Sequence, residues 1–378
     1  MLALILNPVF AISLSWGVSI FFLSFQVSTV SNDGVWFAVS LAAISVSLFA
    51  IAYYATLLSL KMFSRPKNVE ILNVFSLRSG KSLDVVIGFM FLILVLMVFY
   101  NLFVHGVPPI FGLLGESQTA TYKEYGSGKG YIMSIASILF LFSTYASSNK
   151  MNFIAKVFSL MAMSMFVARG SIMKLIVAYF ILKIVEGRLS KKAFFSALLF
   201  VGLAPLIIAK VGDMRSGNDL LIWYFSISPE HTSDNPVFLW LATYVSQPLS
   251  NLLWFVDAGY QVENKMLPFY SVMPASFQLV ASDYVPTLSG SIIDNTHTYV
   301  GYFYLAFGLV GVMFYQVFLG GIFALLLSLP GIKRNPVVIA ILLSSLYFSF
   351  FFDFILFFPT LLQLAMGGVI YAKCCRRV

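Results

Sequence analysis

Charge is what this sequence has least of, because only 10% of its 378 residues are Asp, Glu, Lys or Arg. A soluble domain carries about 25% charged residues, so this composition excludes an ordinary soluble fold. Hydrophobic residues make up 60% of the chain. The mean hydropathy is +0.92. The composition predicts an all-α polytopic membrane protein without a soluble domain of normal size.

The sequence also lacks the signatures of metal and nucleotide chemistry. No Walker A loop, GxGxxG, HExxH, CxxC or DxD pattern occurs. The three histidines lie far apart, and the two cysteines, Cys374 and Cys375, are neighbours, a spacing that strains a disulfide. We therefore expect no metal and no cofactor. The net charge of +8 does not indicate nucleic acid, because the basic residues form short clusters between apolar runs.

Ten apolar segments are long enough to be considered as membrane spans, which need about 20 residues each. They lie at about 3–25, 35–60, 84–104, 131–148, 151–168, 171–187, 192–209, 298–329, 335–352 and 354–372. The N-terminal run lacks a basic leader and a cleavage site, so we expect it to be a retained first span.

The distribution of charge predicts how these spans are oriented. With both termini inside, 16 of the 23 Lys and Arg residues but only 3 of the 15 acidic residues fall on the inner side. Positive charge near span ends marks the cytoplasmic side. The sequence therefore predicts that both termini lie on the cytoplasmic side of the membrane.

One outer connection, residues 210–297, is far longer than the others. It divides the chain into a membrane bundle at 1–209 with about seven spans, the large loop, and a bundle at 298–378 with about three spans. Within the loop, residues 237–256 are apolar, but Gln247 and Pro248 interrupt them. We interpret this stretch as a re-entrant or interfacial helix rather than an additional span. Long loops held by a rigid scaffold often carry function.

Cations on the outer side are the strongest chemical signal. Arg169 lies in MFVARGSIMK, between two apolar runs, and Lys174 follows five residues later. Lys210 and Arg215 stand where the loop begins, in IIAKVGDMRSGND. Cations at span ends also serve as snorkelling anchors. Alternatively they pair with loop carboxylates, or they converge on an anion such as a diphosphate, which Arg binds bidentately.

His297 lies at the end of the loop, in DNTHTYVGYFYLAFGLVG. A single interfacial histidine is more often structural, but beside a phosphate-binding cluster it could accept a proton from a sugar hydroxyl. The glycines of this stretch indicate close helix packing. Asp353, between the last two spans, is interpreted as a helix N-cap.

At these residues the chain resembles the bacterial O-antigen and oligosaccharide repeat-unit polymerases (Wzy type), which are related to the O-antigen ligases. The resemblance covers the topology and about 60 residues, in "ARGS", "GDMRSGN" and "DNTHTYVGYFYLAFGLVG". It implies a GT-C-like, inverting, metal-independent glycosyltransferase with a periplasmic active site. The donor and acceptor would be undecaprenyl-diphosphate-linked oligosaccharides, with membrane lipid and a chain-length-regulating co-polymerase as further partners.

The resemblance also implies roles for individual residues. Arg169 and Arg215 would hold the donor's diphosphate, and His297 would be the base. The second-tier substrate contacts are Lys174, Lys210, Asn295 and Tyr299, and aromatic loop residues such as Tyr244 would stack on sugars or form a membrane belt.

Two alternatives stay open at this point. An O-antigen ligase would use the same donor with a lipid A-core acceptor. A flippase for lipid-linked oligosaccharide would place charges along a central cavity and usually show paired halves.

Overall fold

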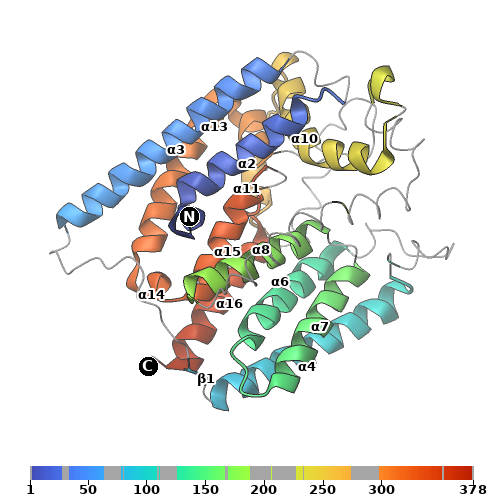
Figure 1. Cartoon of the computed structure of the whole chain (residues 1–378), viewed down its shortest axis with the longest axis vertical. Helices are drawn as coiled ribbons and strands as arrows, with labels where there is room; N and C mark the ends of the chain where they lie inside the picture. Colours follow the sequence, from blue (N-terminus) through green and yellow to red (C-terminus); the bar gives the residue numbers. More distant parts are fainter. Residues whose placement is uncertain are drawn as a thin grey trace.

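The computed structural model describes residues 2–27, 34–63, 78–79, 81–108, 110, 126–166, 169–187, 206, 227–232, 234–273, 298–350 and 353–376. Within these ranges the chain is helical apart from loops and one pair of two-residue strands. The strands β1 (Arg78–Ser79) and β2 (Cys375–Arg376) are antiparallel, with Arg78 opposite Arg376. This pairing joins the residues before α4 to the C-terminal end of α16 (Figure 1).

Helices occupy nine of the ten expected spans, and nearly all of the remaining segment, 192–209, lies outside the described residues. They are α1 (Leu2–Ile5) and α2 (Pro8–Leu23) in the first span, then α3 (Val35–Phe63), α4 (Lys81–His105), α6 (Gly126–Ser143), α7 (Asn149–Met165), α8 (Arg169–Val185), α13 (Gly301–Ser328), α15 (Pro336–Tyr347) and α16 (Phe358–Cys374). The short helix α14 (Pro330–Lys333) lies between two expected spans. The loop region adds η2 (Pro229–His231), α10 (Pro236–Asp257) and α11 (Leu267–Tyr270).

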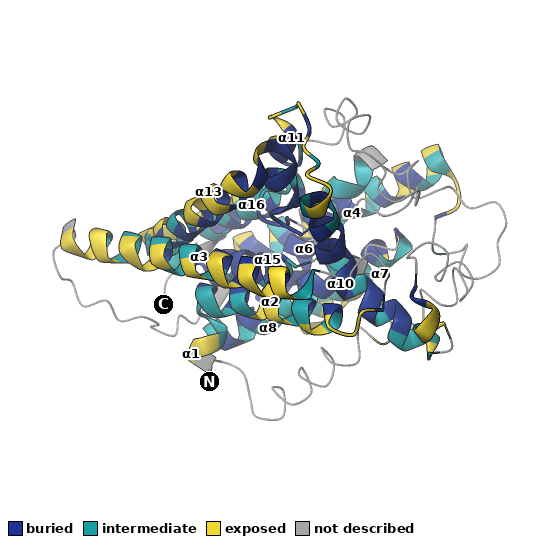
Figure 2. Cartoon of the chain, turned by 90° about the horizontal axis from the view of Figure 1, so that it is seen from above, coloured by how far each residue is buried: buried dark blue, intermediate teal, exposed yellow. Residues whose placement is uncertain are grey.

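Three of the described helices are long and apolar enough to cross a membrane: Val35–Met62, Lys81–His105 and Gly301–Ser328. Their outward faces carry large apolar side chains, and Trp36 and Phe103 are 84% and 90% exposed. Figure 2 shows this exposed character along α3. A soluble monomer rarely exposes a continuous apolar face. Lipid is therefore the environment that suits these helices.

The helix expected at 335–352 is shorter in the structure. Asn335 caps its start by accepting a hydrogen bond from Val338 N, and the helix α15 ends at Tyr347 after 12 residues. At about 1.5 Å per residue it is about 18 Å long. The chain turns after α15, where Ser349 forms hydrogen bonds with residues outside this helix. Its carbonyl accepts a hydrogen bond from Tyr299 N, and its hydroxyl lies 2.8 Å from that of Ser15 on α2.

The helix α13 packs along α3 and is broken near its start (Figure 1). A side chain at Gly320 would collide with the Phe49 carbonyl of α3, so this glycine sets the close approach of the two helices. Gly308 instead has φ 65° and ψ −157° and kinks α13. The glycines near the start of α13 therefore shape the helix itself, whereas the contact with α3 is made further along.

Two residues of the loop region donate hydrogen bonds to the backbone carbonyls at the break in α13. The carbonyl of Leu305 accepts a hydrogen bond from Val262 N at 2.8 Å. The carbonyl of Ala306 accepts one from Lys265 Nζ at 2.5 Å, and the same ammonium reaches the Val262 carbonyl at 3.3 Å. The carbonyls at the break thus regain partners, which a kink in an apolar environment requires.

The predicted helix within the loop region is present as α10, and most of its residues are buried. Asn235 caps it and Pro236 occupies its first turn. It packs against α2 and α13. Pro248 lies inside it, and the Pro248 carbonyl accepts a hydrogen bond from Thr298 N at 3.4 Å. The end of the loop is therefore fixed to the middle of α10, and the depth of α10 in a membrane stays a prediction.

Candidate functional site

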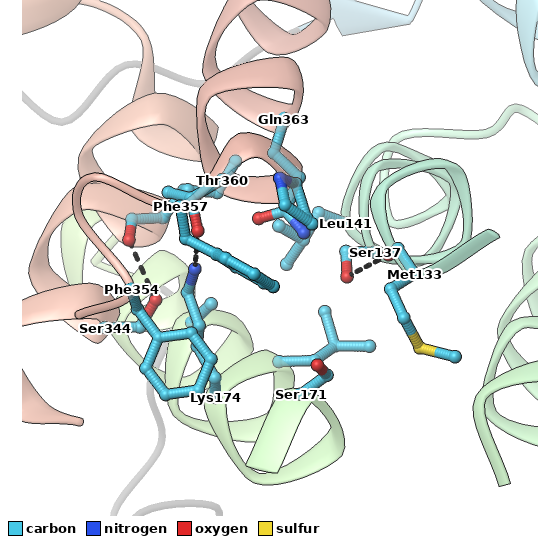
Figure 3. Close-up of a pocket in the computed structure, with 14 residues that line it drawn as sticks. Met133, Ser137, Leu141, Ser171, Lys174, Ser344, Phe354, Phe357, Thr360 and Gln363 are labelled. Atoms are coloured by element: carbon cyan, nitrogen blue, oxygen red, sulfur yellow. Dashed lines mark hydrogen bonds between the residues drawn. The ribbon is translucent and has the colours of Figure 1, made fainter. Parts of the chain in front are cut away.

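A small cavity lies between the helices α6, α8, α15 and α16, and its wall combines apolar and polar side chains. Figure 3 shows the polar residues around it, which are Ser137, Ser171, Lys174, Ser344, Thr360 and Gln363. The apolar part of the wall is formed by Met133, Leu141, Leu175, Ala178, Ile341, Phe354, Phe357 and Pro359. The cavity of about 20 Å³ has room for one water-sized group.

The most informative residue of the cavity is Lys174 on α8. Its side chain is buried, with 6% of the residue exposed. The ammonium donates a hydrogen bond to Thr360 Oγ1 at 2.5 Å and lies 5.1 Å from the centre of the Phe354 ring. Within the described part of the chain no carboxylate pairs with it. A buried cation without a counter-ion is costly and usually marks a functional site.

Gln363 and Ser171 face the same space. Gln363 is 7% exposed, its amide points into the cavity (Figure 3), and it has no hydrogen-bond partner among the described residues. Ser137 differs, because its hydroxyl already donates to the Met133 carbonyl at 2.7 Å. Thr360, Gln363 and Ser171 were not among the residues predicted from the sequence. The pattern that could have indicated them is a three-residue spacing, between Ser171 and Lys174 and between Thr360 and Gln363. Polar residues three apart lie on one face of a helix.

These groups can bind an anion. Lysine has three donors, of which Thr360 uses one, and an amide and a hydroxyl add further donors. The cavity also lies within the first two turns of both α8 and α16, whose N-terminal ends favour negative charge. The space is too small for a sugar ring. It suits one oxygen of an anionic group.

The structure places only part of the predicted site. Arg169 is the first residue of α8, about 7.5 Å along the helix axis from Lys174. Arg215, His297, Lys210 and Asn295 lie outside the described residues. Their roles, and the convergence of Arg169 with Arg215 and His297, stay predictions.

Tyr299 is placed in the core. It is 1% exposed, and its hydroxyl accepts hydrogen bonds from Trp16 Nε1 at 2.9 Å and from Gln316 Nε2 at 2.5 Å. Its ring also packs edge-on against Trp16. Tyr299 therefore ties the chain after His297 to α2 and α13, and the structure does not bring it to the cavity of Lys174.

Tyr244 lies on α10 in a separate small cluster. Its ring is tilted against Trp240, with 6.3 Å between centroids, and it packs beside Val27 and Ile227. It does not line the cavity of Lys174. Its contact with a sugar stays a prediction.

Asp353 caps a turn rather than a helix. Its Oδ1 accepts hydrogen bonds from the backbone N–H groups of Ile355 and Leu356 at 3.0 Å, and Tyr315 donates to Oδ2 at 2.5 Å. The helix α16 begins later, at Phe358. Burial in the connection between α15 and α16 raises the pKa of Asp353 to about 6. The carboxyl holds the turn that places Phe354 over Lys174.

The fold and this cavity define the chain as a helical protein whose apolar helices suit a membrane. Comparisons with protein-family models, with curated proteins and with solved structures found no match.

Proposed function

We propose that the protein is a glycosyltransferase of the O-antigen polymerase type, with about ten membrane spans and its active site on the periplasmic side of the bacterial inner membrane. It transfers the growing polysaccharide from undecaprenyl diphosphate to the non-reducing end of a lipid-linked repeat unit. The resemblance of the three local motifs and the predicted topology support this proposal.

The structural observation that carries the proposal is a buried cation in α8 that no carboxylate among the described residues pairs with. Lys174 is buried beside a polar cavity, and the same helix begins at Arg169. Two cations in the first turns of a helix oppose its dipole, so packing alone does not account for them. A phosphate-bearing substrate supplies the missing negative charge.

The proposed mechanism gives each predicted residue one task. Arg169 and Arg215 bind the donor diphosphate and stabilise the charge that develops on it as it leaves. His297 accepts the proton of the acceptor hydroxyl, whose oxygen attacks the anomeric carbon with inversion. The bond from that carbon to the diphosphate oxygen breaks, and undecaprenyl diphosphate departs with the bonding electrons.

Elongation in proteoliposomes that contain purified lipid-linked repeat units tests the proposal. We expect the wild type to form longer glycans, and Arg169→Ala and Arg215→Ala to abolish elongation while the proteins still insert. His297→Ala is expected to lose at least about a hundredfold in rate, because general-base catalysis contributes about that much. Arg334→Ala, in the connection between α14 and α15, is the matched control and should retain activity. Absence of elongation by the wild type contradicts the proposal.

Two assays separate the related functions. A polymerase deletion would leave single-repeat lipopolysaccharide, whereas a ligase deletion would leave no attached O-antigen. A flippase is the second candidate, because a buried cation inside a bundle also suits transport of an anionic lipid-linked substrate. Exchange of labelled lipid-linked oligosaccharide between leaflets, without elongation, would favour the flippase.

A further inference from the structure

Two matched pairs of polar residues line the cavity, in addition to Ser137 and Ser344, whose hydroxyls donate to backbone carbonyls of their own helices. Ser171 and Lys174 are three residues apart on α8, and Thr360 and Gln363 are three apart on α16. Residues at this spacing lie on one face of a helix. Figure 3 shows both pairs around the same space. The helices therefore present a group of hydrogen-bonding side chains to each other across the cavity.

The charge of this arrangement is unbalanced. Among the described residues, Lys174 donates one hydrogen bond, to the neutral hydroxyl of Thr360, and no carboxylate there pairs with the ammonium. Gln363 is buried and has no partner among the described residues. A single water molecule would satisfy donors but leave the charge uncompensated. An anion would satisfy both requirements.

Size and surroundings narrow the class of anion. The cavity of about 20 Å³ admits one oxygen atom rather than a whole sugar or a carboxylate-bearing ring. A lysine ammonium binds phosphate as a point charge and can direct its donors at a single oxygen, without the two-oxygen geometry that arginine uses. The N-terminal turns of α8 and α16 add the dipole that phosphate groups favour.

We infer that this cavity is a binding site for one oxygen of a phosphate group, held by Lys174, Gln363 and Ser171. Thr360 positions the ammonium. The identification of the phosphate as part of a lipid-linked diphosphate rests on the proposed function, whereas the binding site itself does not.

Binding to the purified full-length protein in detergent tests the inference. The probes are inorganic phosphate and farnesyl diphosphate, and dispersed short-chain phosphatidylglycerol, each measured by thermal unfolding and titration calorimetry at constant ionic strength. We expect farnesyl diphosphate to raise Tm, Lys174→Met to weaken its binding at least about tenfold and Gln363→Leu about fivefold. Lys265→Met is the matched control and should change affinity less than about twofold.

Further variants keep the test decisive. If Lys174→Met does not fold, Ser171→Ala and Gln363→Leu take its place, and unchanged affinity in both overturns the site. Wild-type protein that responds to none of the three probes overturns it as well, as expected for a cavity that holds only water. Phosphatidylglycerol binding that depends on Lys174, without a farnesyl diphosphate response, supports the phosphate site but overturns the lipid diphosphate as its ligand.

The failure of this inference is distinguishable from failure of the proposed function. Elongation by the wild type, with farnesyl diphosphate affinity that Lys174→Met leaves unchanged, removes the site and leaves the polymerase. Farnesyl diphosphate binding that depends on Lys174, in a protein that elongates no glycan, keeps the site and removes the polymerase.

Discussion

Two lysines of this protein show how similar groups take different roles. Lys265 Nζ donates to two backbone carbonyls, at 2.5 and 3.3 Å, where Gly308 breaks α13. Lys174 Nζ donates to one hydroxyl at 2.5 Å and faces a cavity. Both side chains also lie near an aromatic ring, Phe307 for Lys265 and Phe354 for Lys174. The number of acceptors, rather than burial alone, separates a structural lysine from one that can take a ligand.

The surroundings of the two lysines explain this difference. A broken helix exposes carbonyl oxygens, so the ammonium at the break finds acceptors that need it. The helix α8 is continuous around Lys174, and its carbonyls there are used within the helix. Lys265 therefore donates hydrogen bonds to carbonyls at the interrupted part of α13. Lys174 keeps donors that no described residue accepts.

Exchanging each lysine for Met gives the largest expected contrast. Lys174→Met should lower elongation by about a hundredfold, the typical effect of removing a group that stabilises developing charge. Lys265→Met should keep elongation within about threefold but lower the unfolding free energy by about 1–3 kcal/mol, because Ala306 loses a partner. Elongation rates and Tm of both variants provide the measurement. Equal losses of elongation rate in the two variants would contradict different roles for Lys174 and Lys265.

Gly308→Ala tests the break in α13 itself. The backbone at this position has φ 65° and ψ −157°, a region open almost only to glycine, so we expect a loss of about 1–3 kcal/mol in stability. A Cβ would also collide with the amide of Gln261. Gly88→Ala on α4 is the control, because nothing lies within 4 Å of its added Cβ. Unchanged Tm in Gly308→Ala would contradict the kinked geometry.

Asp353 extends the comparison to a buried acid with several partners. Its pKa is raised from 3.8 to about 6 by burial, so the folded chain binds the proton more tightly than the unfolded chain. Its contribution to stability is therefore greatest below pH 3.8 and is lost as the pH rises through about 6. We expect the Tm to fall over this range in the wild type and to be flatter in Asp353→Asn. Parallel curves for the two proteins would remove Asp353 as the cause.

Most of the helices could be predicted from the sequence, because long apolar runs have few other stable arrangements in lipid. The segments at 35–60 and 84–104 became α3 and α4 with ends a few residues away. The prediction at 335–352 was too long, because Ser349 bonds to α2 and to the chain before α13. Such partners come from distant parts of the sequence, and local hydropathy carries no information about them.

The candidate site was predictable only in its charges. Arg169 and Lys174 stood out because cations in apolar surroundings are costly. Gln363 and Thr360 did not stand out, because the sequence does not show which helix a polar residue of an apolar helix faces.

The scarcity of charge and the length of its apolar runs determined by themselves that this chain forms apolar helices suited to lipid, because burial of backbone groups in lipid leaves few alternatives. Tertiary structure alone decided which lysine donates to backbone carbonyls and which keeps donors for a ligand. That choice depends on whether α13 breaks beside Lys265 and on whether α16 brings Thr360 and Gln363 to Lys174. Both are contacts between segments far apart in the chain.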